Sequence, residues 1–253
     1  MNKNSLKGIA TEVIDLKINS LKNLKKSIDK NFEKAVNTII DCQSKIILCG
    51  VGKSGLISAK IASTLSSIGS PAFSLSANDC LHGDLGSITR KDVLILISNS
   101  GKSDELIPII KFANRNKIKL IGIVSKKNSF LYKASDIKIL MPEVKESGLG
   151  IVPTSSTSIQ LAMGDALAIA ALKKKQFSKY DFSRLHPGGN LGKQLKTVGD
   201  VMVTGKKVPF INENKSMTEA LRIISKKKLG VVIVCNKNKT TTGIITDGNV
   251  RKL

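Results

Sequence analysis

Aromatic residues and arginine are the scarcest features of this sequence. It contains no Trp, two Tyr and seven Phe in 253 residues, too few for the stacking platforms that bind single-stranded nucleic acid. Only five of its 41 basic residues are arginine, the side chain that contacts bases and phosphates bidentately. We therefore expect no specific nucleic-acid partner, although the formal net charge is +22.

Positive charge is spread along the sequence and forms no basic arm. Residues 1–45 carry a net charge of +4, residues 46–195 of +10 and residues 196–253 of +8. Because lysines supply almost all of it, this charge predicts a general attraction for small anions and no particular macromolecule.

Cysteine is also sparse and shows no disulfide or metal-binding spacing. Cys42, Cys49, Cys80 and Cys235 include no CxxC pair, so we expect four reduced thiols and no zinc site. Charged side chains recur every few positions in the first forty residues. Because this leaves no long apolar run, no signal peptide or membrane span is expected there. We expect a cytoplasmic protein without a membrane partner, required metal or cofactor.

Helical periodicity precedes an alternation of strands and helices. Apolar residues repeat at three- and four-residue intervals between positions 21 and 40, which predicts amphipathic helices. From residue 46 onward, short apolar runs alternate with helical stretches, as in an α/β fold whose parallel sheet is flanked by helices on both faces. The apolar stretch 156–172 predicts a helix buried in the core or in a subunit interface.

Four segments follow from this pattern. Residues 1–45 are expected to form N-terminal helices, and residues 46–183 the α/β core. Residues 184–199, with His186 and a run rich in Gly and Pro, are expected to form a linker. Residues 200–253 predict a small β-α-β-β unit, too short to be a robust domain alone.

Two loops at the ends of predicted strands are suited to anions. The Gly50–Gly55 loop has glycines that let the backbone approach a ligand, and Ser54 is expected to cap the helix that follows. The Ser98–Ser103 loop offers three hydroxyls in front of a second helix. In parallel sheets, ligands bind at this edge. We interpret the second loop as a phosphate site, with simple helix capping as the alternative.

Four titratable residues lie in loops or at a helix start. His82 and His186 are the only histidines, and each is open to a functional or a structural interpretation. Glu105 opens the helix after the serine loop, where an acid also favours the helix dipole. Glu146 follows the strand predicted at 137–140 and is expected at the same edge of the sheet as the serine loop.

Six motifs resemble, in their order, those of one family. They are GVGKSG at 50–55, HGDLG at 82–86, SNSG at 98–101, PTSST at 153–157, MGDAL at 163–167 and HPGG at 186–189. Together they resemble the D-arabinose 5-phosphate isomerases, in which a sugar-isomerase (SIS) domain is followed by CBS modules. The resemblance implies a flavodoxin-like three-layer α/β sandwich followed by a small α+β CBS module.

The resemblance also implies an activity. An aldose-ketose isomerase of this family interconverts D-ribulose 5-phosphate and D-arabinose 5-phosphate, the entry to 3-deoxy-D-manno-octulosonate for lipopolysaccharide. The reaction passes through an enediol and needs no redox cofactor. It requires a base beside the carbonyl, a group that moves the hydroxyl proton, and an anchor for the phosphate.

The family's functional positions fall on Lys53, His82, Glu105, Glu146 and His186. We expect Lys53 to stabilise the enediolate, Glu105 to orient Lys53, and either Glu146 or His186 to be the carbon base. The expected substrate-binding residues are Gly52, Ser54, His82, Ser98, Ser100 and Ser103.

The sequence departs from the family pattern in two places near the expected site. Lys102 stands where the family usually has Glu. The segment 146–150 is one residue short and lacks the usual Cys-Pro, which alters the surroundings of Glu146.

The C-terminal part resembles a single CBS module. Residues 246–251 resemble the end of a first module, and the sequence stops at Leu253. Paired modules form a cleft for adenine nucleotides or other anionic regulators, so one module is not expected to form that cleft alone. Pairing with a neighbouring subunit's copy is the alternative. Family members are typically homotetramers with shared active sites, and the helix at 156–172 is a candidate contact.

Three competing functions remain. A non-catalytic sugar-phosphate sensor would need the serine loop but not Lys53, Glu146 and both histidines together. A SIS isomerase of another phosphosugar would use the same motifs. A SIS-type transcriptional regulator would need a helix-turn-helix unit, which residues 1–45 do not indicate.

Overall fold

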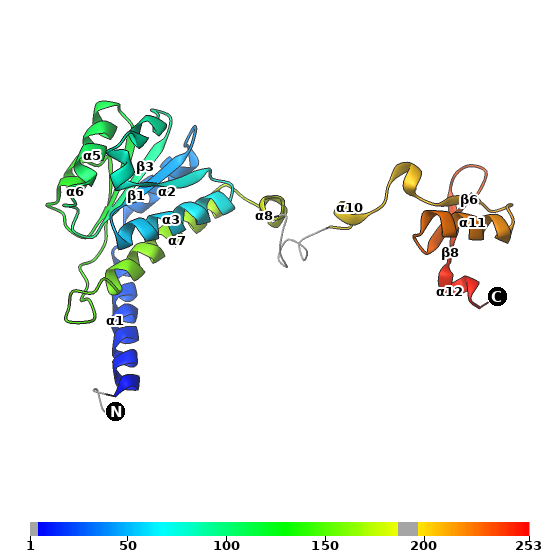
Figure 1. Cartoon of the computed structure of the whole chain (residues 1–253), viewed down its shortest axis with the longest axis horizontal. Helices are drawn as coiled ribbons and strands as arrows, with labels where there is room; N and C mark the ends of the chain where they lie inside the picture. The colour runs from blue at the N-terminus through cyan, green and yellow to red at the C-terminus, as the bar shows by residue number, and fades with distance from the viewer. Residues whose placement is uncertain (1–4, 187–196, 253) are drawn as a thin grey trace. The chain divides into compact units, whose positions relative to one another are not determined.

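The computed structural model describes residues 5–186 and 197–252, and the protein forms two compact units, Met1–Lys193 and Gln194–Leu253 (Figure 1). Each unit is described by itself. The first contains α1 (Leu6–Lys26), α2 (Lys30–Ile40), β1 (Ile46–Gly50), α3 (Lys53–Ser67), β2 (Ala72–Ser76), α4 (Ala77–Cys80), η1 (Asp84–Ser87), β3 (Val93–Ser98), α5 (Leu106–Arg115), β4 (Lys119–Val124), α6 (Phe130–Ala134), β5 (Ile137–Leu140), α7 (Ser155–Lys174) and α8 (Lys179–Leu185).

The five strands form one parallel sheet in the order β2-β1-β3-β4-β5. Side chains alternate along β1, so that Ile46 and Leu48 face one side of the sheet while Ile47 and Cys49 face the other. Because both faces are covered, the central strands are apolar throughout, as expected for a parallel sheet.

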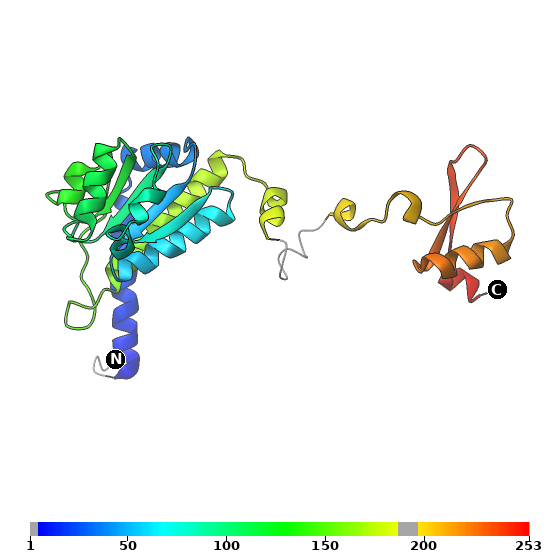
Figure 2. The same cartoon turned by 45° about the horizontal axis from the view of Figure 1, so that its top comes forward.

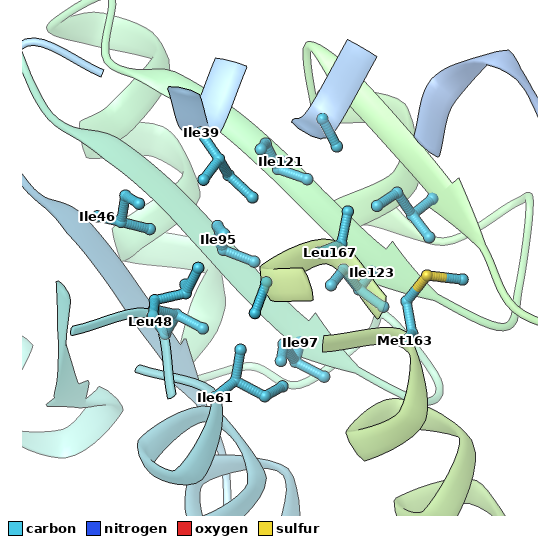
Figure 3. Packing of buried hydrophobic residues seen from close by; sticks show 14 of the residues in the cluster. Ile39, Ile46, Leu48, Ile61, Ile95, Ile97, Ile121, Ile123, Met163 and Leu167 are labelled. Carbon is cyan, nitrogen blue, oxygen red and sulfur yellow. The ribbon is translucent and has the colours of Figure 1, made fainter. Parts of the chain in front are cut away.

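Two hydrophobic cores lie on the two faces of the sheet. The first packs α1, α2, α3 and α7 against the sheet and includes Ile39, Ile61, Ile95, Ile121 and Leu167 (Figure 3). The second packs α4, α5 and α6 against the opposite face. This three-layer arrangement confirms the predicted α/β class.

Helix α7 is a central element of the first core. Ile159, Met163 and Leu167 are buried, and the helix packs against α1, α2 and α3. Figures 1 and 2 show α3 and α7 side by side on one face of the sheet. The sequence predicts this helix in the core or in a subunit interface, and within the first unit it lies in the core.

The second unit is a small α+β module. It contains α10 (Val198–Val201), η2 (Gly205–Lys207), β6 (Phe210–Asn212), α11 (Met217–Lys227), β7 (Val231–Cys235), β8 (Thr241–Thr246) and α12 (Asp247–Val250). Strand β7 lies between β6, its parallel neighbour, and β8, its antiparallel neighbour. The core is small and centres on Ile211, Ala220, Ile224 and Val232, and the predicted small α+β module is confirmed.

Across the two described stretches of the sequence, the search for a helix with the length and hydropathy of a membrane span finds none.

Candidate active site

The strand order creates a ligand-binding edge between β1 and β3. The polypeptide leaves β1 toward β2 on one side and leaves β3 toward β4 on the other, which makes this pair the switch point of the sheet. In sheets of this order, ligands bind beyond the carboxyl ends of the strands at that point. Gly50 pairs with Ile97, so the glycine loop and the serine loop start side by side.

The glycine loop is shaped by close backbone contacts. A Cβ on Gly50 would lie 2.8 Å from the carbonyl carbon of Ser54, and one on Gly55 would lie 2.8 Å from the Gly50 oxygen. Gly52 has φ +56° and forms the N-cap of α3 without a side-chain capping bond. The loop borders a cleft of about 340 Å³ that also reaches Ser76 and Asn78.

The predicted capping role of Ser54 is wrong. Helix α3 begins at Lys53, so Ser54 already lies in its first turn, and the N-cap is Gly52. The Ser54 hydroxyl instead donates to Gln160 Oε1 of α7 at 3.2 Å. The helix therefore begins without its own side-chain cap, which leaves its positive dipole end available to an anion.

Hydrogen bonds organise the serine loop. The Ser98 and Ser103 hydroxyls lie 3.1 Å apart, and Ser98 Oγ accepts the Gly101 N–H at 3.0 Å. Ser100 Oγ accepts the Lys102 N–H at 3.2 Å. Three hydroxyls thus lie in one tight loop directly before α5, whose N-terminus receives no side-chain cap from the residues described.

Two further residues hold this loop in place. Ser125, at the end of β4, donates from its hydroxyl to Asn99 Oδ1 at 2.9 Å and from its N–H to the Asn99 carbonyl oxygen at 3.1 Å. Gly101 has φ +63°, and a Cβ there would meet Ser129 Oγ at 2.3 Å. The loop is therefore anchored to the neighbouring strand, and only Gly fits at its turn.

The side-chain carboxylate of Glu146 lies at the N-terminus of α7. Its carboxylate accepts the N–H groups of Thr154 and Ser155 at 2.8 Å each, and that of Ser156 at 3.2 Å. Burial raises the pKa of this carboxyl, but the Ser156 side chain and the three backbone N–H groups outweigh it, and the net pKa is lowered. Glu146 is thus a fixed anion at a helix start, a geometry unsuited to a strong base.

The other expected catalytic residues lie in different surroundings. Lys53 is exposed at the start of α3, and His82 is exposed just after α4. Glu105 is the N-cap residue of α5 but makes no side-chain capping bond. No hydrogen bond or ion pair joins Glu105 to Lys53 among the described interactions, so its expected orienting role stays a prediction.

His186 lies at the C-terminal end of α8. Its ring stacks on Phe182 with 3.8 Å between centroids, and Nδ1 lies 2.8 Å from the Phe182 carbonyl oxygen. A carbonyl can only accept, so Nδ1 donates this bond; in a singly protonated ring Nε2 then carries the lone pair, and within residues 5–186 and 197–252 no bond to Nε2 is seen. These contacts are with its own helix; residues 187–196, the rest of the expected His186 loop, lie outside the described residues.

Two buried thiols lie below the glycine loop. Burial, followed by the neighbouring Cys80, raises the pKa of Cys49 to about 12. Burial also raises the pKa of Cys80. Both stay protonated at neutral pH, which makes them unreactive. In the part of the sequence that the structure describes, no group of three or more His, Cys, Asp or Glu side chains could hold a metal ion.

Sequence reasoning missed Gln160, Asn99 and Ser125. Gln160 carried one usable signal, because it is a lone amide flanked by Ile159 and Leu161 in a strongly apolar helix. Asn99 lies in the SNSG motif at 98–101, but its pairing with Ser125 could not be inferred, since it depends on β3 and β4 being neighbours in the sheet.

Comparisons with known proteins agree with this geometry. A SIS domain matches residues 39–170, and a CBS domain matches residues 198–253. The arabinose 5-phosphate isomerase KdsD of Yersinia pestis is 40% identical over 244 residues, which cover 96% of this chain and 74% of that protein. The KdsD of Escherichia coli O157:H7 gives the same identity and coverage.

A solved structure shares the fold of the first unit. It is an E. coli CFT073 protein in complex with arabinose 5-phosphate, with a TM-score of 0.70 and 32% identity, covering 74% of this chain and all of that one. The parallel sheet, the two domain matches and these relatives lead to one conclusion: the chain is a sugar-phosphate isomerase and belongs to the D-arabinose 5-phosphate isomerase family.

Proposed function

We propose that the protein interconverts D-ribulose 5-phosphate and D-arabinose 5-phosphate through an enediol, and that its product supplies 3-deoxy-D-manno-octulosonate for lipopolysaccharide. The KdsD relatives and the neighbour solved with arabinose 5-phosphate support this choice of substrate. In this reaction hydrogen moves between adjacent carbons of one molecule, so the step needs no external electron acceptor.

The observation that carries the proposal is the serine loop at the switch point. The Ser98 and Ser103 hydroxyls lie 3.1 Å apart before the N-terminus of α5, and Ser100 lies in the same loop, where its hydroxyl accepts the Lys102 N–H. These donors and the helix dipole are suited to the dianionic phosphate of a sugar phosphate. The cleft lined by Gly52 and Gly55 has room for the sugar carbons.

We assign the carbon base to His186 and a supporting role to Glu146. With Nδ1 donating to the Phe182 carbonyl, the Nε2 lone pair of His186 can take a proton from carbon, whereas the Glu146 carboxylate is already engaged by three N–H groups. Exposed Lys53, which follows Gly52 of the cleft lining, is suited to stabilise the negative enediolate oxygen. His82 is assigned to sugar binding.

The described contacts of His186 lie within its own helix. It contacts Phe182, and no contact with Lys53 or the serine loop is seen among the described residues. We propose a homotetramer in which His186 completes the active site of a neighbouring subunit. A direct test of this arrangement is complementation: mixing inactive Lys53→Ala and His186→Ala subunits would restore part of the activity.

The assay that tests the reaction offers D-ribulose 5-phosphate to the purified protein and measures D-arabinose 5-phosphate. We expect saturable product formation, and a rate at least 100-fold lower in the His186→Ala variant, because general bases contribute about 10²–10⁴-fold. Tyr180→Phe, on the same short helix, is the control and keeps the wild-type rate. Binding without turnover would support the sensor, and turnover of a hexulose phosphate alone would support a different isomerase.

A further inference from the structure

Buried polar atoms without a partner are concentrated in one segment. Within residues 5–186 and 197–252 they are Ser147 Oγ, Ser155 Oγ and Gln160 Nε2. All three lie between residues 147 and 160, in the loop before α7 and in its first turns. Because folded proteins pair nearly all their buried polar groups, three unpartnered atoms within fourteen residues call for a physical explanation.

Gln160 is the most informative of the three. It is 1% exposed, and from Ile159 to the end of α7 it is the one polar side chain among the buried residues of the helix. It cannot touch a ligand directly. Its Oε1 atom, however, accepts the hydroxyl of Ser54 at 3.2 Å, and Ser54 is only partly buried and lies in sequence between Gly52 and Gly55, which line the cleft.

This contact joins the starts of two helices that carry the site. Ser54 follows Lys53 in the first turn of α3, and Gln160 lies one turn beyond Ser156, whose N–H binds Glu146. Farther along, the same helices touch where Gly164 approaches Ile61 and where Lys60 pairs with Asp165. The Ser54–Gln160 bond is therefore the polar α3–α7 contact nearest to the proposed chemistry.

We propose that Gln160 is a positioning residue for the sugar-phosphate site. Its amide fixes the Ser54 hydroxyl and with it the start of α3, so that Lys53 and Ser54 face the substrate in one arrangement. Because the Ser54 proton is donated to Oε1, the lone pairs of its oxygen are left to accept a hydroxyl of the sugar. This role rests on the proposed sugar-phosphate function.

A double-mutant cycle tests the proposal. Ser54→Ala, Gln160→Met and the double variant are compared for kcat, KM and the Kd of D-arabinose 5-phosphate measured by calorimetry. Each single variant is expected to lower kcat/KM about 5- to 10-fold, the effect of one lost hydrogen bond. The double variant is expected to lose no more than the more impaired single variant, because both changes remove the same contact.

The controls separate positioning from stability. Ile159→Val, on the same helix, removes one buried methylene and lowers stability without touching a polar group; it is expected to keep the wild-type kcat/KM. Gln160→Glu retains an acceptor oxygen for Ser54 and is expected to be more active than Gln160→Met. If Gln160→Met does not fold, Gln160→Leu, which also removes the acceptor oxygen, takes its place in the cycle.

Two results would overturn the role of Gln160. One is a Gln160→Met enzyme with the same kcat/KM as Ile159→Val, and the other is a double variant whose loss is the product of the two single losses. The Kd measurements make failure of this proposal distinguishable from failure of the proposed function. They detect the coupling between Ser54 and Gln160 even if the wild-type protein binds D-arabinose 5-phosphate without isomerising it.

Discussion

At the scale of single residues, hydrogen bonding decides what Glu146 can do. The sequence indicates a loop carboxylate at the ligand edge of the sheet, open to the role of a base. In the structure three N–H groups at the start of α7 hold the carboxylate and lower its pKa. A carboxylate held in this way stabilises the fold in its charged form and is a weaker base.

We therefore expect the contribution of Glu146 to the free energy of unfolding to depend on pH. At pH 7 the Glu146→Gln variant should unfold with a free energy about 1–2 kcal/mol lower than wild type, because the charge-assisted bonds are lost. A carboxyl whose folded pKa lies below its usual 4.5 stabilises the fold above that value. The difference between the two proteins should shrink as the pH falls below 4.5 through the folded pKa.

Chemical denaturation at several pH values measures this difference. Glu143→Gln is the matched control, since Glu143 forms an ion pair with Lys126 while its side chain is 65% exposed, and such pairs contribute little. Equal stability of Glu146→Gln and wild type at pH 7 would contradict the geometry described for α7.

At the scale of elements, the site depends on how closely α3 and α7 approach. A Cβ on Gly164 would lie 2.2 Å from Ile61 Cδ1 and 2.3 Å from Cγ1. Ile61 is 2% exposed and packed within the first core. The missing side chain at Gly164 therefore sets the distance between α3, which begins at Lys53, and α7, whose N-terminus binds the Glu146 carboxylate.

Gly164→Ala should destabilise the first unit. In an open helix this change is favourable by roughly 1 kcal/mol, but overpacking in a dense core costs about 1–3 kcal/mol. We expect a net loss of stability and a lower kcat as the helix starts shift apart. Thermal unfolding and steady-state kinetics measure both effects.

Two further variants serve as controls for Gly164→Ala. Gly86→Ala, at a position with open space and an ordinary φ, should leave the melting temperature nearly unchanged. Adding Ile61→Ala to Gly164→Ala should destabilise the protein by less than the sum of the single changes, because the clash is relieved. A Gly164→Ala protein more stable than wild type would show that the helices separate without penalty.

At the scale of the whole molecule, the charge of +22 is the most general property. It arises almost wholly from scattered lysines, and the described ion pairs with side chains more than 40% exposed, such as Lys60–Asp165 and Lys119–Asp136, neutralise little of it. Such a field attracts phosphosugars from a distance without contributing to the chemical step.

Salt should therefore weaken substrate capture and leave turnover unchanged. Raising NaCl from about 0.05 to 0.5 M shortens the Debye length several-fold. We expect kcat/KM for the phosphosugar to fall about two- to threefold while kcat stays constant. Sucrose at matched osmolality is the control and should change neither value. A kcat/KM independent of salt would limit the role of charge to solubility.

Local patterns were enough to establish the fold class, the family and the two loops at the ligand edge. Apolar runs indicated the strands, three- and four-residue spacing the helices, and short motifs such as residues 50–55 and 98–101 the loops. The same local reasoning led to a cap by Ser54, because a hydroxyl near a helix start most often bonds to its own backbone.

Which side chains meet depends on the packing of the layers and could not be inferred from those patterns. The strand order places the glycine loop and the serine loop together, α7 supplies Gln160 to Ser54, and the N-terminus of α7 engages Glu146. Ser54 and Gln160 are 106 residues apart in the sequence, and no local pattern contains their contact. The chemistry of each residue fixes its own preferences, but a hydrogen bond between distant residues forms only where the fold brings donor and acceptor together.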